Sequence, residues 1–123
     1  MLQWGDLFTA RQKASLVELG ARLSDLNSLA GQRGGAAALA RLADKNASLA
    51  VWNQVGEKIE HVFGRQALPI VWDFAEVPVF SNATGNFLSG LHLVAKVIDA
   101  WPPSSLGQVQ SADAAAHPLL DCP

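Results

Sequence analysis

Residues whose side chains commonly bind metals or act as nucleophiles are few and far apart in this sequence. His61, His92, His117 and Cys122 show no paired spacing such as Cys-x-x-Cys or His-x-x-x-His, which is typical of a zinc site. Cys122 is the penultimate residue, and we expect no base to be oriented against its thiol. We therefore interpret the histidines as surface or core residues, and predict neither a metal site nor a nucleophilic centre.

Two carboxylates, Asp73 and Glu76, lie three residues apart in an apolar setting that includes Trp72 and Phe74. A buried pair of acids can carry acid–base chemistry, because burial and mutual repulsion shift the pKa values of both groups. Carboxylates also cap turns, and prolines bound this segment on both sides. We favour capping of the neighbouring proline-bounded turns and keep a functional acid pair as the alternative.

Glycines are concentrated at residues 31–35. A glycine-rich loop that binds phosphate connects a strand to a helix, so that backbone amides and the helix N-terminus meet the anion. Here the glycines separate two stretches that both show helical spacing of leucines. The sequence therefore predicts the turn of a helical hairpin at 31–35, and not a loop that binds a cofactor.

Composition and charge narrow the class of protein. The chain has 123 residues, of which 50% are hydrophobic and 16% charged, which is enough apolar material for one packed domain and too little charge for a disordered tail. The net charge is −2, and the densest basic group is only Arg33, Arg41 and Lys45. Because nucleic-acid binders usually carry a strong basic patch, we do not expect this chain to bind DNA by itself.

The cysteine content and the lack of long apolar runs indicate the cellular compartment. A single cysteine excludes an internal disulfide and is typical of a reducing environment. We find no apolar run of about 18 residues that could span a membrane, and no basic region followed by an apolar core at the start of the sequence. We therefore expect a cytoplasmic protein that has no contact with membrane.

The predicted elements are mainly helical. Thr9 and Gln12 form a capping box, followed by leucines at 16, 19, 23 and 26 that make one apolar stripe. We predict a second helix over 36–52, a short third helix over 57–63, and a last helix over 88–101, which Pro102 and Pro103 end. The fold class is thus mainly α: a helical hairpin plus one or two further helices, with a proline-bounded apolar segment and a short extended C-terminal tail.

Two regions follow from this pattern. Residues 1–103 form the predicted helical domain, and residues 104–123 form the tail, in which 107–113 could be one short strand. Within the domain, the segment 67–80 is too apolar for a solvated loop and contains prolines that prevent a continuous helix. We expect it to cover the helical core with Trp72 as a buried anchor; the alternative is a docking surface on which Trp72 is exposed.

Three blocks of sequence carry a resemblance to a known family. They are Trp-Gly-Asp-Leu-Phe-Thr-Ala-Arg-Gln at 4–12, Leu-Ala-Asp-Lys-Asn at 42–46 with Trp52, and Phe-Gly-Arg-Gln-Ala-Leu-Pro-Ile-Val-Trp-Asp-Phe-Ala-Glu at 63–76. The chain resembles, over nearly its whole length, a family of large bacterial and archaeal adenine-specific DNA methylases that contain a zinc-ribbon region. The residues of this chain that match the most specific block are Arg65, Gln66, Pro69, Trp72, Asp73 and Glu76.

The resemblance implies a role beside a catalytic domain. Residues 111–121 are similar to the stretch that precedes the family's catalytic strand, and Asp113 matches a position that faces the cofactor, S-adenosylmethionine. The family's glycine-rich cofactor loop and its Asp-Pro-Pro-Tyr motif do not occur in this sequence. Methylation of an adenine amine needs the base to be flipped out and stacked beside the cofactor. We therefore expect no methyltransferase activity and no S-adenosylmethionine binding by the isolated chain, which calorimetry can test.

The function that the resemblance implies is that of a non-catalytic helical segment, a gene remnant or a detached part. It would pack on the methyltransferase catalytic portion and shape its cofactor and DNA surfaces, so that DNA is a partner only of the whole enzyme. The alternative, from the residues alone, is a free-standing helical module that binds another protein through 67–80.

Overall fold

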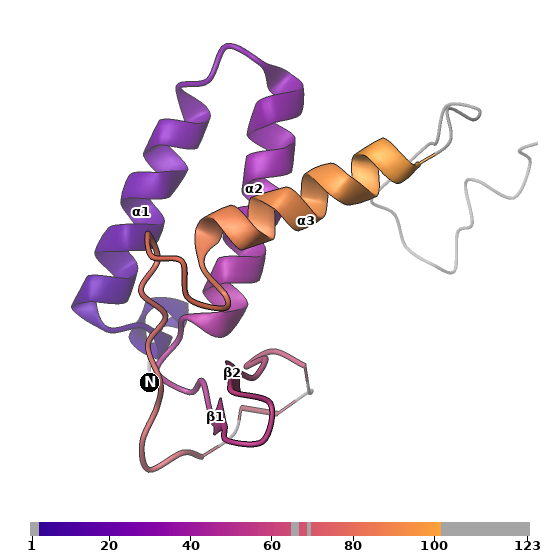
Figure 1. The fold of residues 1–123 in the computed structure, drawn as a ribbon. Coiled ribbons are helices and arrows are strands. Elements are labelled where there is room, and N and C mark those ends of the chain that lie inside the picture. Colours follow the sequence, from indigo (N-terminus) through magenta and orange to yellow (C-terminus); the bar gives the residue numbers. More distant parts are fainter. Residues whose placement is uncertain (1–2, 65–66, 69, 102–123) are drawn as a thin grey trace, which may run out of the picture.

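The computed structural model describes residues 3–64, 67–68 and 70–101. Its main feature is a helical hairpin that a third helix crosses (Figure 1). The mainly helical fold class predicted from the sequence is confirmed. In chain order the elements are η1 (Trp4–Leu7), α1 (Ala10–Ser24), α2 (Leu29–Lys45), β1 (Trp52–Asn53), β2 (Lys58–Ile59) and α3 (Phe87–Ala100).

Each of the three α-helices begins at a side chain that caps it. The predicted capping box of α1 is present: the Gln12 amide donates to the Thr9 hydroxyl, and the Thr9 amide donates to Gln12 Oε1 at 2.8 Å. Ser28 accepts a hydrogen bond from the Gly31 amide at 3.2 Å at the start of α2, and Asn86 caps α3 in the same manner.

The turn of the hairpin lies at residues 25–28, and the prediction that placed it at 31–35 was wrong. The glycines of that stretch belong to α2, which begins at Leu29. Gly35 is buried, and a Cβ at this position would lie 2.3 Å from Leu23 Cδ2 of α1. Glycine is thus required by the close approach of the two helices, which offsets its low helix propensity.

The predicted end of the second helix and the predicted helix over 57–63 were also wrong. The second helix ends at Lys45 instead of continuing to 52, and Trp52 belongs to β1. The predicted helix over 57–63 does not form. In its place β1 and β2 pair antiparallel, with Trp52 opposite Ile59, and Glu57 in the connecting turn has a φ of 45°. The last predicted helix, over 88–101, is confirmed as α3.

The core consists of two groups of buried side chains. One group joins the loop after α2 to the strand pair, which lies below the hairpin in Figure 1. The other group lies between α1 and α2. The residues of the first are Ala47, Ala50, Ile59, Val62 and Val77, and those of the second are Leu19, Leu42 and Val79. Val77 and Val79, from the same extended segment, therefore connect the two groups.

Helix α3 crosses α2 and leaves the body of the molecule at its C-terminal end (Figure 1). The crossing is close at Gly90, where a Cβ would be 3.6 Å from the carbonyl oxygen of Ala38, a residue with no exposed surface. Beyond this point the apolar side chains of α3 are exposed, at Leu93, Val97 and Ile98. None of the described helices has the length and apolarity of a membrane span.

Candidate functional site

The apolar segment that the sequence predicted as a cover of the core has both buried and exposed apolar side chains among its described residues. Ala75, Val77 and Val79 point inward and pack in the core groups. Side chains at even positions, Ile70, Trp72, Phe74 and Phe80, are exposed instead. Residues 77–80 alternate between buried and exposed, as in an extended backbone. At Trp72 and Asp73 the chain bends, and both side chains are exposed.

Trp72 is one of these exposed side chains, and the expectation that it anchors the core was wrong. Its side chain is fully exposed, and that of Ile70 is 93% exposed. Val77 and Val79 pack in the core beside Ile59 and Leu42 instead. The exposure of Trp72 is the one that the alternative assumed, and the docking surface itself stays a prediction.

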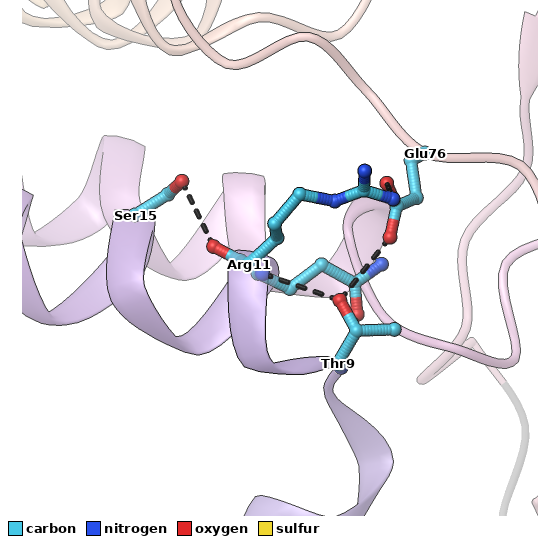
Figure 2. Close-up of polar contacts among 5 residues, drawn as sticks. Thr9, Arg11, Ser15 and Glu76 are labelled. Atoms are coloured by element: carbon cyan, nitrogen blue, oxygen red, sulfur yellow. Dashed lines mark hydrogen bonds and ion pairs between the residues drawn. The ribbon is translucent and has the colours of Figure 1, made fainter.

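Glu76 holds this segment on the start of α1. One carboxylate oxygen accepts a hydrogen bond from the Thr9 hydroxyl at 3.1 Å, and the other accepts one from Arg11 Nη2 at 2.7 Å (Figure 2). The carboxylate thus meets both an arginine and the positive end of the α1 dipole. The backbone next to it is held as well, because the Ala75 amide donates to the Ala50 carbonyl at 3.0 Å.

Asp73 and Glu76 have different partners, and the expectation that both cap the neighbouring proline-bounded turns was wrong for Glu76. Asp73 is exposed, and its Oδ1 accepts a hydrogen bond from the Phe74 amide at 2.9 Å. Glu76 is directed at α1, where an arginine and a hydroxyl bind it. Asp73 therefore fixes local backbone, whereas Glu76 joins the segment to side chains at the start of α1. Of the other residues predicted from the sequence, Arg65, Gln66, Pro69 and Asp113 lie outside the described residues.

Asp44 and His61 form a second polar contact, which no sequence pattern indicated because the residues are 17 positions apart. The Asp44 carboxylate contacts His61 Nδ1 and accepts a hydrogen bond from the Phe63 amide at 2.9 Å. The Val62 amide donates to the Asp44 carbonyl at 3.1 Å. Burial raises the pKa of Asp44, but the hydrogen bonds from Phe63 and His61 outweigh it and leave the pKa below its usual value.

This shift predicts how stability depends on pH. A carboxyl group whose pKa is lower in the folded chain stabilises the fold above its unfolded pKa, near 3.8, and loses that contribution as the pH falls through its folded value. We expect Asp44→Asn to lower the free energy of unfolding by about 1–2 kcal/mol at neutral pH. Urea unfolding at several pH values measures this. The difference from the parent should shrink below the unfolded pKa, and Asp99→Asn on the exposed side of α3 should have almost no effect.

Acidic groups and histidines do not gather into a metal site: the described part of the chain holds no group of three or more His, Cys, Asp or Glu side chains placed to bind an ion. The exposed apolar side chains at positions 70, 72 and 74 are the other feature of this region that a function could use. We call Ile70, Trp72 and Phe74 the outward row.

Comparison with known proteins found no matching family model, no matching curated protein and no matching solved structure.

Proposed function

We propose that this chain is a non-catalytic helical module that docks on a larger protein through its outward row, and that this protein is the catalytic portion of a DNA methyltransferase. The observation that carries the proposal is the full exposure of Trp72 beside the nearly full exposure of Ile70. Large apolar side chains that stand together in solvent are characteristic of a surface that another protein covers. The resemblance of the sequence supplies the identity of the partner.

The backbone that follows the outward row is held by contacts with α1 and with the loop after α2. Glu76 is bound to Thr9 and Arg11, and Ala75 is bound to Ala50, so the chain leaves the core at a defined place. Asp73 holds the amide of Phe74 within the row itself. A docking segment that is ordered beforehand loses less conformational entropy on binding, which favours affinity.

The alternative is a free-standing interaction module that uses the same surface on an unrelated protein. The exposure of the outward row supports this alternative equally, and only the identity of the partner separates the two. Neither requires S-adenosylmethionine to bind this chain, and DNA is a partner only in the first, through the whole enzyme. The two functions therefore predict the same effects of substitutions within the row.

The test is binding of the purified chain to a protein that carries the glycine-rich cofactor loop and the Asp-Pro-Pro-Tyr motif, from the same genome, measured by calorimetry. We expect Trp72→Ala to weaken binding by about tenfold or more, since buried tryptophans dominate protein interfaces. Trp4→Ala is the matched control, because Trp4 is also exposed (75%) but belongs to η1. Absence of binding would exclude the methyltransferase partner. Equal binding by parent and Trp72→Ala would exclude the outward row as the docking surface.

A further inference from the structure

A polar pocket of about 280 Å³ lies where the last turn of α2 meets the first turn of α3. Arg41 and Lys45 of α2 line it on one side, and Asn82, Thr84 and Ser89 on the other. No aspartate or glutamate is among the described residues that line this pocket. It is therefore a cavity with two positive charges, several hydrogen-bond donors and no anion of its own.

Lys45 is the most unusual of these residues, because it is buried without a partner. Only 8% of it is exposed, and it makes no hydrogen bond or ion pair with any described residue. Its aliphatic part lies against Gly85, where a Cβ would be 3.7 Å from Lys45 Cδ. The buried part is the aliphatic stem, and the ammonium nitrogen keeps contact with solvent, so an anion that enters the pocket can reach it. No described carboxylate forms an ion pair with it.

Arg41 adds a second charge to the same wall. It lies one turn before Lys45, so the two cations share a face of α2 and repel each other. The stem of Arg41 lies against Gly90 of α3, where a Cβ would be 3.7 Å from Arg41 Cδ. The N-terminus of α3, capped by Asn86, brings the positive end of a helix dipole to the pocket as well. The two charged side chains that line the pocket are therefore both positive.

We propose that this pocket binds a phosphate group. A phosphate dianion balances two cations, and its oxygens point in several directions, which suits the guanidinium of Arg41 together with the hydroxyls of Thr84 and Ser89. A single carboxylate offers one charge and a planar pair of oxygens. The phosphate can come from a free phosphate or phosphomonoester, or from the backbone of DNA. The site does not depend on the docking function, because it shares no residue with the outward row.

The experiment is an amide NMR titration of the full chain with inorganic phosphate, with sodium chloride at equal ionic strength as the reference. We expect saturable shifts of the Gly85 and Ser89 amides. Arg41→Gln should weaken the apparent affinity at least about fivefold, because hydrogen bonds to a charged group are strong, and Lys45→Met should abolish the shifts. Arg33→Gln is the matched control: it removes one exposed charge from the same helix but lies outside the pocket, and should leave the titration unchanged.

A short DNA duplex titrated in the same way separates the two sources of phosphate. The same shifts at lower concentration than with inorganic phosphate identify the DNA backbone, and shifts with inorganic phosphate alone identify a free phosphate or phosphomonoester. Shifts that do not saturate, that chloride reproduces, or that saturate in Arg41→Gln with the affinity of the parent would overturn the proposal. Because Arg41 is exposed, its substitution leaves the core intact, and the test stands even where Lys45→Met fails to fold.

Discussion

Replacing Leu42 by alanine should lower the free energy of unfolding by about 2–5 kcal/mol, the range for a truncated leucine in a well-packed core. Leu42 lies on α2 with 2% of its surface exposed, and it packs with Leu19 of α1 and Val79 of the extended segment. One substitution therefore removes contacts that hold three parts of the chain together. A loss of this size is comparable to the whole stability of a small domain, so much of the variant should be unfolded at room temperature.

Urea unfolding followed by circular dichroism measures the effect, with Trp72→Ala as the comparison. Truncation of a tryptophan in a core costs about 3–5 kcal/mol, and the sequence alone predicted such a cost at Trp72. Because the side chain is fully exposed, we now expect its midpoint to match that of the parent. A large loss in Trp72→Ala together with a small loss in Leu42→Ala would contradict the assignment of the core.

Helices were predictable from this sequence where a cap and an apolar stripe agreed. The capping box at Thr9 gave the start of α1, and the leucines at 16, 19 and 23 gave its inward side, whereas Leu26 lies beyond its end and is exposed. The apolar spacing and the prolines at 102–103 gave α3, whose cap in the structure is Asn86. In both helices the local signals do not depend on what the rest of the chain does.

Elements that depend on distant contacts could not be predicted. The glycines at 31–35 indicated a turn, but their purpose is the approach of α1, which no local pattern reveals. Ile59, Val62 and Phe63 have helical spacing by coincidence, since Ile59 belongs to a strand whose partner is Trp52. The turn between them is held by the Asn53 side chain, which accepts a hydrogen bond from the Gly56 amide at 2.9 Å.

The candidate sites, too, were predictable only where they depend on local sequence. The apolar character of 67–80 was visible in the sequence, but which row faces the core depends on Ala75, Val77 and Val79 meeting α1 and the loop after α2. Both sets of alternate positions contain apolar residues, so no local pattern tells which set is buried. Lys45 drew notice only as part of a weak basic group, because its burial is created by the turn at Gly85 and by the start of α3.

Gly34 and Gly35 are neighbours in α2, and their replacement by alanine should shift stability in opposite directions. A Cβ at Gly34 would meet Val94 Cγ1 of α3 at 3.9 Å, an ordinary contact, so Gly34→Ala should gain about 0.5–1 kcal/mol from helix propensity. A Cβ at Gly35 would lie 2.3 Å from Leu23 Cδ2 and 3.2 Å from its Cγ, so α1 and α2 must move apart or Leu23 must leave its rotamer.

Overpacking of this kind costs about 1–3 kcal/mol, which exceeds the gain in propensity. We therefore expect the midpoints of the two variants to lie on either side of the parent, with free energies of unfolding that differ by about 2 kcal/mol. Thermal and urea unfolding of the three proteins under the same conditions measure the difference. If residues 31–35 formed the turn of the hairpin, neither alanine would add to a helix and the two substitutions would have similar effects. Opposite signs follow only where both glycines lie within a continuous α2 and Gly35 faces α1.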